Sequence, residues 1–352
     1  MASRTNAVGS ARRYWGTMPV LPGDQLTATV KGMEQAGFEG VFVLQIYGPP
    51  FVPLAAASTV TDALKLGSGV AIAGTRSPVE TAYAAMDLDR ISGGRFVLGI
   101  GSSIPSCTEG MYGMPPAKPL GHLRETVDVI RYVIANAHKG LDPYDGHYFK
   151  ADFKEMMITA PPVRERIPIW IAALQEKMTD LALEIGDGLM VHALWSADYT
   201  ARVQKPVIEA ALAKHGRKRE DIEINAWPWI AINDDKGQAI EDARPTVAAY
   251  SGYKQYEPFF EKLGFGDQAR ACQLGLGQHG DVKSVIHNVP DEMVLAFCAC
   301  GSVDDVLRQI EPYWEVVDSL APMTPYRELS MDKLTFYYQG LFQLVAHARG
   351  LG

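Results

Sequence analysis

Two glycine-rich segments that lie near each other in the chain have the residue types expected around a flat ligand. The first is LGSGVAIAG, residues 66–74, and the second is RFVLGIG, residues 95–101, which Ser102 and Ser103 follow. Both runs are apolar enough to be buried strands, and both end in glycine. Glycine at a strand end lets the backbone approach a planar molecule closely, because no Cβ stands in the way. The two segments therefore predict a surface for a large planar ligand.

The residues that follow the other apolar runs are mostly small, amide-bearing or aromatic. They are Gln45 and Tyr47, residues 172–177, residues 192–195 and residues 227–229. No carboxylate pair, HExxH motif, nucleophile elbow or Ser/His/Asp spacing occurs among them. Hydrolysis by a metal or by a protein nucleophile is therefore not indicated, and no metal is expected. The set favours a planar cofactor that brings its own reactivity.

An anion site is predicted where the run 169–172 leads through ALQEKM, residues 173–178, into a helix over 179–185. Free amide groups and the helix dipole would hold a phosphate there, and Lys177 would add positive charge. An ordinary strand-to-helix turn with a surface lysine is the alternative.

The GxGxxG match at 275–280 is a weaker candidate for a nucleotide-phosphate site. No strand precedes it and its surroundings look helical, so a Rossmann interpretation is rejected.

His192 is the ionisable side chain best placed to contact a substrate or cofactor, because it ends a predicted strand. The alternative is a histidine that packs in the barrel wall. Trp15, Trp195, Trp227 and Trp229 are candidates for the walls of a substrate cavity, although buried tryptophans are more often simple packing.

Eight apolar runs are typical of strands, and helical patterns separate most of them. They cover residues 14–18, 41–45, 66–72, 95–100, 169–172, 188–192, 222–232 and 316–319. This alternation predicts an α/β fold, a (β/α)8 TIM barrel rather than an open doubly wound sheet, as one domain over residues 1–352. Catalytic residues of such barrels lie at the carboxyl ends of the strands.

Two connections of the predicted barrel are too long for a plain helix. They are residues 139–168, after strand 4, which contain the hairpin-like DPYDGHYF, and residues 244–301, after strand 7, which are rich in aromatics and glycine. Long loops in a compact domain usually serve as covers or oligomer contacts, and we expect the same of these insertions.

The composition narrows the class of protein. The chain has 352 residues, 47% of them hydrophobic, and a net charge of −8, which argues against a nucleic-acid binder. The basic run 215–219 is predicted to be a solvated helix end. Four cysteines without paired spacing suit a reducing cytoplasm, and neither a membrane span nor a signal peptide is indicated. We therefore expect a cytoplasmic protein.

Six segments from about residue 35 to residue 305 carry a family resemblance. They are EQAGFEGVFV, TRSPVETAYAAMDLD, ISGGRFVLGIGSS, MYGMPPAKPLGHLRE, IPIWIAALQEKMTDLALEIGDG and DEMVLAFCACGSVDDV. Together they resemble the bacterial luciferase-like monooxygenase superfamily, and most of all its branch of coenzyme F420 (deazaflavin)-dependent oxidoreductases. The resemblance implies a (β/α)8 barrel with the flavin or deazaflavin across its carboxyl-terminal mouth, and a homodimer.

The resemblance also implies which positions hold the cofactor. The ring would lie against a bulged segment with a non-prolyl cis peptide at Gly69–Val70, for which an ordinary trans strand is the alternative. The implied ring, ribityl and phosphate positions are, in that order, Gly69, Val70 and Ala71; Gly101, Ser102 and Ser103; and Ala173, Leu174, Gln175, Glu176, Lys177 and Met178.

The sequence departs from its relatives after the second strand. Many deazaflavin enzymes have an acidic residue followed by histidine there, whereas this chain has Leu44, Gln45, Ile46 and Tyr47. Gln45 can orient a carbonyl group but cannot supply a proton, whereas Tyr47 can. His192, Tyr47 and Gln45 are therefore the catalytic candidates.

The function predicted from these features is a coenzyme F420-dependent oxidoreductase. It would transfer a hydride between the deazaflavin and an apolar organic substrate, at an alcohol/carbonyl or an activated C=C bond. An FMN-dependent luciferase-like monooxygenase that uses O2 stays open, because both cofactors share a ring and a phosphate; so does a non-catalytic partner subunit. The acidic tail of F420 would favour a basic track, for which the candidates are Lys118, Arg124, Arg164 and Arg166. The substrate and the direction of transfer are not predicted.

Overall fold

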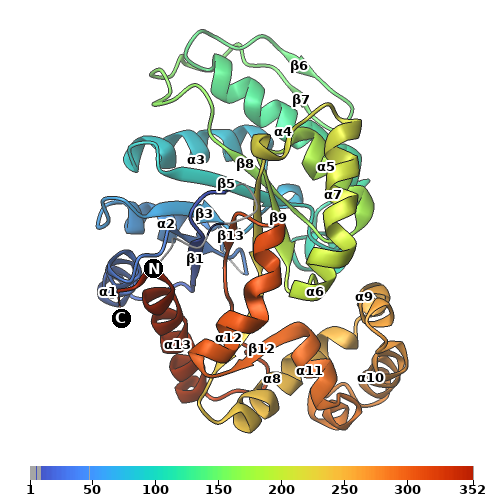
Figure 1. Ribbon diagram of the computed structural model, residues 1–352. Coiled ribbons are helices and arrows are strands. Elements are labelled where there is room, and N and C mark those ends of the chain that lie inside the picture. The colour runs from blue at the N-terminus through green and yellow to red at the C-terminus, as the bar shows by residue number, and fades with distance from the viewer. Residues whose placement is uncertain (1–4, 6–8, 47, 352) are drawn as a thin grey trace. The chain divides into compact units, whose positions relative to one another are not determined.

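The computed structural model describes residue 5 and residues 9–46 and 48–351 (Figure 1). The chain divides into two compact units. The N-terminal unit comprises residues 16–190 and 211–223, and the C-terminal unit comprises residues 1–15, 191–210 and 224–352. Four elements run along the chain from one unit into the other: β1 (Arg13–Met18), β9 (Gly188–His192), α7 (Lys205–Lys214) and β10 (Glu223–Trp227).

The N-terminal unit is built from strand–helix repeats. Its elements are α1 (Gly23–Gln35), β2 (Gly40–Val43), α2 (Phe51–Ser58), β3 (Lys65–Ser68), β4 (Ala71–Ile72), α3 (Pro78–Ile91), β5 (Phe96–Gly101), α4 (Pro119–Asn136), β6 (Tyr144–Asp145), β7 (Lys150–Ala151), β8 (Ile169–Ala173) and α5 (Glu176–Ile185). Short 3-10 turns and one π-helical turn, Ser106–Met111, join them. Strands β2, β3, β5 and β8 pair in parallel, and α3, α4 and α5 pack beside them (Figure 1).

Local sequence explains where these elements begin. The buried strands β2 and β5 read GVFV and FVLGIG, apolar on both faces as parallel strands between helices must be. Helix α3 starts at Pro78, and the Ser77 hydroxyl accepts a hydrogen bond from the backbone N–H of Val79 at 3.2 Å. Proline in the first turn and serine at the N-cap are both favourable at a helix start.

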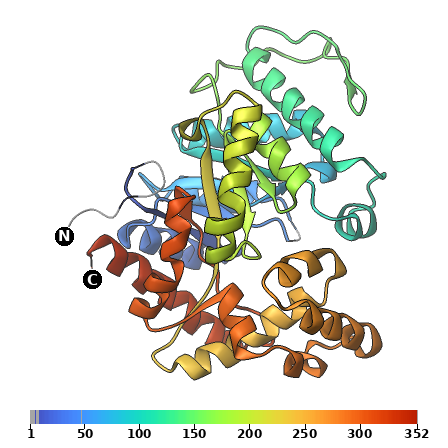
Figure 2. The same cartoon turned by 45° about the vertical axis from the view of Figure 1, so that its right-hand side comes forward.

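The C-terminal unit has three parallel barrel strands, β1, β13 (Ser319–Leu320) and β10, with β13 in the middle. Its other elements are α6 (Ala197–Tyr199), β11 (Trp229–Ile232), α8 (Lys236–Ser251), α9 (Glu257–Lys262), α10 (Gly266–His279), α11 (Asp291–Phe297), β12 (Cys298–Gly301), α12 (Val303–Ile310) and α13 (Met331–Arg349). Helices α8 to α11, in orange tones, gather within this unit (Figure 2).

The predicted (β/α)8 fold class is confirmed, because all eight predicted runs contain parallel strands with helical connections. The run 188–192 coincides with β9. The run 66–72 is interrupted after Ser68 and resumes at Ala71, and the run 222–232 is interrupted at Pro228. Proline has no N–H for a strand ladder, so β11 leaves β10 and pairs instead with β12. Strand β12, CACG, was not predicted, because four small residues carry no periodic pattern.

The two insertions have different structures. The hairpin predicted in 139–168 is confirmed, since β6 and β7 pair antiparallel through Tyr144 and Ala151. The expectation of a long loop over 244–301 is wrong, because α8 to α11 fill most of that segment. The GxGxxG match lies within α10, which Gly280 ends at φ +68°, so the rejection of a Rossmann site is confirmed.

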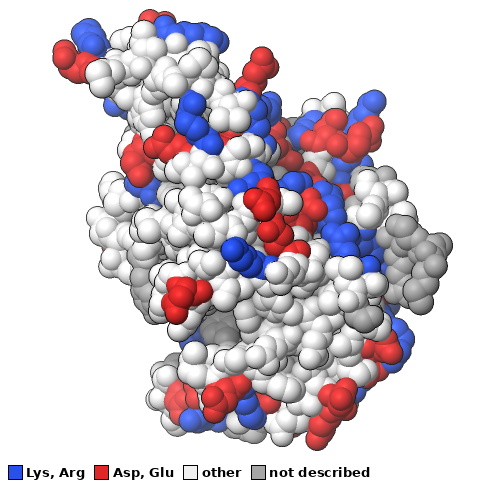
Figure 3. Space-filling view, turned by 90° about the vertical axis from the view of Figure 1, so that its left-hand side faces the viewer, with Lys and Arg blue, Asp and Glu red and all other residues white. Residues whose placement is uncertain are grey.

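Acidic and basic side chains alternate over the face drawn in Figure 3. This intermingling is unlike the basic stripe of a nucleic-acid binder. None of the helices in the described part of the chain has the length and apolarity needed to cross a bilayer.

Candidate functional site

Gly101, the last residue of β5, lies against two neighbouring strand ends of the N-terminal unit. A Cβ built on Gly101 would lie 3.0 Å from Val70 Cγ2 and 3.2 Å from Ala172 Cβ. Carbon atoms in ordinary contact are about 3.5–4.0 Å apart, so a larger residue requires a neighbour to move. The structure thus brings Gly101 against Val70, in the predicted ring segment, and against Ala172, which directly precedes the predicted phosphate segment 173–178.

The backbone around these strand ends has two unusual conformations. The peptide bond Gly69–Val70 is cis, as predicted. Ser103 has φ +58°, in the left-handed region that residues other than glycine rarely adopt. Ser103 is exposed, and the hydroxyl of Ser102 donates only a long hydrogen bond of 3.4 Å to the Ser103 carbonyl. The small polar side chains after β5 are therefore available to a ligand.

Gln45 lies two residues beyond β2, and protein groups occupy every hydrogen-bonding position of its amide. Oε1 accepts from the backbone N–H of Ile72 and from Arg76 Nη2, both at 2.9 Å. Nε2 donates to Thr75 Oγ1 at 3.1 Å and to the Tyr112 hydroxyl at 3.2 Å. An amide has two N–H donors and an oxygen with two lone pairs. Gln45 thus fixes the turn at 72–76, and a substrate would have to displace one of these partners.

Arg76 and Tyr112 are polar residues of this cluster that sequence reasoning missed. Arg76 lies over the Phe51 ring, 5.4 Å from guanidinium carbon to ring centroid, and its Nε is 3.6 Å from Glu80. Burial lowers the pKa of Arg76 from its usual value. The only available signal was family resemblance, because both residues lie in segments noted for it. The cluster places a partly buried cation and a phenol on the amide of Gln45.

Helix α5 begins at Glu176, so the predicted start at residue 179 is wrong by three residues. Gln175 is its N-cap, with an extended backbone and no capping bond from its side chain. The backbone N–H groups of Met178 and Thr179 bond to the Gln175 carbonyl at 3.0 and 2.9 Å. The N–H groups of Glu176 and Lys177 precede the first helical bond and point along the dipole toward the helix start. This end of α5 has the geometry of a phosphate site, beside the exposed Lys177.

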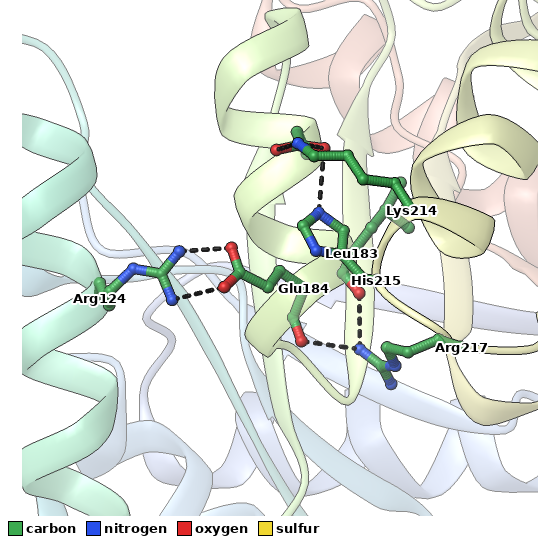
Figure 4. A network of polar contacts seen from close by, with 7 residues as sticks. Arg124, Leu183, Glu184, Lys214, His215 and Arg217 are labelled. Atoms are coloured by element: carbon green, nitrogen blue, oxygen red, sulfur yellow. Dashed lines mark hydrogen bonds and ion pairs between the residues drawn. The ribbon is translucent and has the colours of Figure 1, made fainter.

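Ion pairs on the outer face hold α5 in place (Figure 4). Arg124 of α4 forms a two-pronged pair with Glu184, in which one N···O distance is 2.9 Å. Asp180 accepts from Lys214 at 2.8 Å and lies 3.0 Å from His215 Nε2. The hydrogen bond from Arg124 lowers the pKa of Glu184, and the hydrogen bond from Lys214 does the same to the pKa of Asp180. Both carboxyl groups are therefore charged at neutral pH.

Arg217 satisfies the opposite end of α5. Its Nη1 donates to the carbonyls of Leu183 at 2.8 Å and Gly186 at 2.7 Å, and Figure 4 shows the first of these bonds. A cation is favourable at a helix C-terminus, where carbonyls lack helical partners. The prediction that the run 215–219 is merely solvated is wrong for Arg217, which fixes the helix whose other end is the predicted phosphate site.

The predicted basic track is largely neutralised. Three of its four members bind carboxylates, namely Arg124 with Glu184, Arg164 with Asp89, and Arg166 with Asp187. Lys118 lies directly before α4. Paired cations attract an acidic tail weakly, so the geometry does not support this prediction.

His192, in the C-terminal unit, is half-buried among aromatic rings. Its ring centroid lies 5.5 Å from Trp229, 5.0 Å from Tyr250 and 6.4 Å from Tyr256. The backbone N–H of Leu194 donates to His192 Nδ1 at 3.3 Å. Burial lowers the pKa of His192 to about 4, so the ring is neutral at pH 7 and cannot serve as an imidazolium acid.

The tryptophans predicted to wall a substrate cavity are all buried. Trp15, Trp195 and Trp229 are each 1% exposed, and Trp227 is 7% exposed. Trp229 lines a cavity of about 170 Å³ together with Phe297. Burial of this degree is also what packing alone produces, so their role as pocket walls stays a prediction.

Tyr47, the remaining catalytic candidate, lies outside the described residues. Within the described ranges, no three His, Cys, Asp or Glu side chains gather in a metal-binding arrangement. The four cysteines are all free thiols.

The comparisons with known proteins agree with this fold. The sequence profile of the luciferase-like monooxygenase family matches residues 9–319. The 5,10-methylenetetrahydromethanopterin reductase of Archaeoglobus fulgidus is 33% identical over 292 residues, which cover 81% of this chain and 85% of that protein.

Two solved structures of low sequence identity share the fold. The coenzyme F420-dependent tetrahydromethanopterin reductase of Methanopyrus kandleri superposes with a TM-score of 0.79 at 24% identity, over 96% of this chain and 98% of that one. An F420-dependent secondary alcohol dehydrogenase, in complex with an F420–acetone adduct, superposes with a TM-score of 0.71 at 16% identity, over 95% and 98%.

The fold is a (β/α)8 barrel. The chain belongs to the luciferase-like monooxygenase family, as the resemblance of its segments predicts.

Proposed function

We propose that the protein is a coenzyme F420-dependent oxidoreductase, which transfers a hydride between the deazaflavin and an apolar organic substrate with a carbonyl, alcohol or activated C=C group. A relative and two solved structures whose names state F420 dependence support this proposal, as does the shared fold over nearly the whole chain. The observation that carries it is the close approach of Val70 and Ala172 to Gly101, which brings the predicted cofactor segments together with no side chain between them.

The residues of the N-terminal unit fit such a cofactor. Residues 69–71 and 101–103 offer backbone and small side chains to a planar ring and its ribityl chain, and residues 173–178 offer the amide groups of α5 to a phosphate. The deazaflavin, when bound, supplies the hydride-transfer chemistry. The chain's own part is to bind and orient the reactants and to exclude water.

The three candidate residues have different roles in the acid–base chemistry of this proposal. A neutral His192 can donate a hydrogen bond to a substrate oxygen and polarise it. Gln45 acts in this proposal as a positioning residue, because its amide holds Arg76 and Tyr112. Tyr47 carries the phenol that the sequence offers for proton transfer. Assembly as a homodimer and location in the cytoplasm belong to the same proposal.

Titration of the purified protein with F420 and, in parallel, with FMN tests this proposal, with tryptophan fluorescence as the signal. Saturable binding that favours F420 is the expected result. A preference for FMN would replace the proposal by oxygen-dependent monooxygenase chemistry. Binding of neither cofactor would favour the non-catalytic partner subunit.

A further inference from the structure

Three rings of the C-terminal unit form what we call the aromatic platform: His192, Tyr250 and Tyr256. The planes of Tyr250 and Tyr256 differ by 18°, those of His192 and Tyr256 by 18°, and those of His192 and Tyr250 by 34°. Their centroids are 5.0 to 6.4 Å apart. Nearly parallel planes at these centroid spacings are those of offset stacking, so each ring covers only part of its neighbour.

A buried indole supports the aromatic platform. Trp229 meets Tyr250 edge-on at 4.6 Å and His192 edge-on at 5.5 Å, and it is 1% exposed. The Tyr250 hydroxyl is 3.3 Å from that of Tyr326. These contacts fix the rings, while all three platform residues remain only half-buried and so keep surface for a ligand. A rigid aromatic surface loses little entropy when a flat molecule binds to it.

The hydrogen-bonding state of His192 follows from its contacts. Nδ1 accepts the Leu194 N–H, so the single hydrogen of the neutral ring is on Nε2. For Nε2, no hydrogen-bond partner is found in residues 9–46 or 48–351. The titratable groups that face the ring are Tyr250 and Tyr256, and burial raises the pKa of each, so both are neutral at pH 7. The aromatic platform therefore carries one uncommitted neutral donor.

We propose that the aromatic platform binds a flat, conjugated carbonyl compound, whose π system stacks on the tyrosine rings and whose oxygen, in the plane of the imidazole ring, accepts a hydrogen bond from His192 Nε2. The inference rests on the proposed function and names its substrate class. A flat cation, the usual guest of an aromatic cluster, is disfavoured here because it would meet the positive end of the Nε2–H bond.

The tautomer is tested by nitrogen-15 NMR of the histidine side chains in the full chain, with His192→Gln used for assignment. We expect a His192 ring with a protonated Nε2 and a bare Nδ1, unchanged between pH 8 and pH 5. A ring with its hydrogen on Nδ1, or one that titrates with a midpoint above pH 5, would overturn the proposal.

Binding is tested by calorimetry with cinnamaldehyde, with β-methylstyrene as the same skeleton without its carbonyl, and with benzyltrimethylammonium as the flat cation. His192→Phe keeps a ring and removes the donor. We expect it to weaken cinnamaldehyde binding about 3- to 10-fold, the worth of one hydrogen bond, and to leave β-methylstyrene unchanged. Tyr256→Leu should weaken both. His279→Phe, at an exposed helix end, is the matched control and should weaken neither.

The proposal fails if cinnamaldehyde does not bind, if His192→Phe binds it as the wild type does, or if the cation binds more tightly. Thermal melts of each variant show whether it is folded, and His192→Gln, which retains an N–H donor, should recover part of the affinity. All titrations are run with and without F420. Carbonyl binding without F420 binding would refute the proposed function alone, whereas F420 binding without carbonyl selectivity would refute only this inference.

Discussion

Gly101→Ala tests the cofactor surface at its most constrained point. The new methyl group would lie 3.0 Å from Val70 Cγ2 and 3.2 Å from Ala172 Cβ. Ordinary carbon contacts begin near about 3.5 Å, so the shortfalls are roughly 0.5 and 0.3 Å. Val70 can give way by a small rotation of its side chain, and Ala172 by a small shift of its backbone. We therefore expect a loss of about 1 kcal/mol in the free energy of unfolding, at the low end of overpacking costs.

The expected effect on cofactor binding is larger than the effect on stability. Relief of the clash would push Val70 or Ala172 toward the surface on which the ring is proposed to lie. We expect the Kd for F420 to rise at least about 10-fold, equivalent to about 1.4 kcal/mol. The assay is the fluorescence titration, made at a temperature where urea unfolding shows the variant to be fully folded.

The matched control for this variant is Gly110→Ala. A Cβ on Gly110 meets no atom within 4 Å, although the residue lies in the segment that follows the same strand. Its Kd for F420 should equal that of the wild type. A folded Gly101→Ala protein with unchanged affinity would refute the reasoning, because the glycine would then not be needed for close approach of the ring.

Three further changes have directions fixed by the structure. Gln45→Ala removes the acceptor of the Ile72 N–H and of Arg76 Nη2 and should lower the free energy of unfolding by about 1–3 kcal/mol in urea; Gln45→Glu keeps the acceptor and should cost less. Gly277→Ala fills open space within α10 and should raise stability by about 0.5–1 kcal/mol, leaving F420 and FMN affinity unchanged; loss of either would revive the Rossmann interpretation. The pKa of Asp180 is held below its usual 3.8, so its stabilisation is present above that pH and lost as the pH falls through the lowered value. The melting temperatures of wild type and Asp180→Asn should therefore converge below about pH 3.8, and a constant difference from pH 6 to pH 3 would contradict the assignment.

The sequence predicted the barrel because buried parallel strands leave a strong apolar signature. Residues 188–192 show this well, since the predicted run has the same bounds as β9. The strand end at Gly101 and the strand-to-helix turn near Lys177 were also predictable, because glycine and helix starts have local physical causes.

Other features depend on contacts that no local pattern contains. The saturation of the Gln45 amide needs Tyr112, which is 67 positions away in sequence. Arg217 closes α5 from more than 30 positions away. The helices within 244–301 were taken for loop because glycine and aromatic residues hid their amphipathic pattern, and tertiary packing overrode those weak propensities. Pro228 indicates a break between β10 and β11, because proline interrupts a strand ladder. The apolar residues on both sides of it made residues 222–232 look like one continuous strand.

The most direct test of the proposed function follows the hydride itself. Reduced F420 that carries deuterium at its hydride-donating ring carbon is mixed with the protein and a conjugated carbonyl compound in the absence of oxygen, and the product is examined by mass spectrometry. The proposed function predicts a reduced product that carries one deuterium on carbon, formed at a rate proportional to protein concentration. Absence of deuterium transfer, together with product formation only from reduced FMN and oxygen, would contradict it.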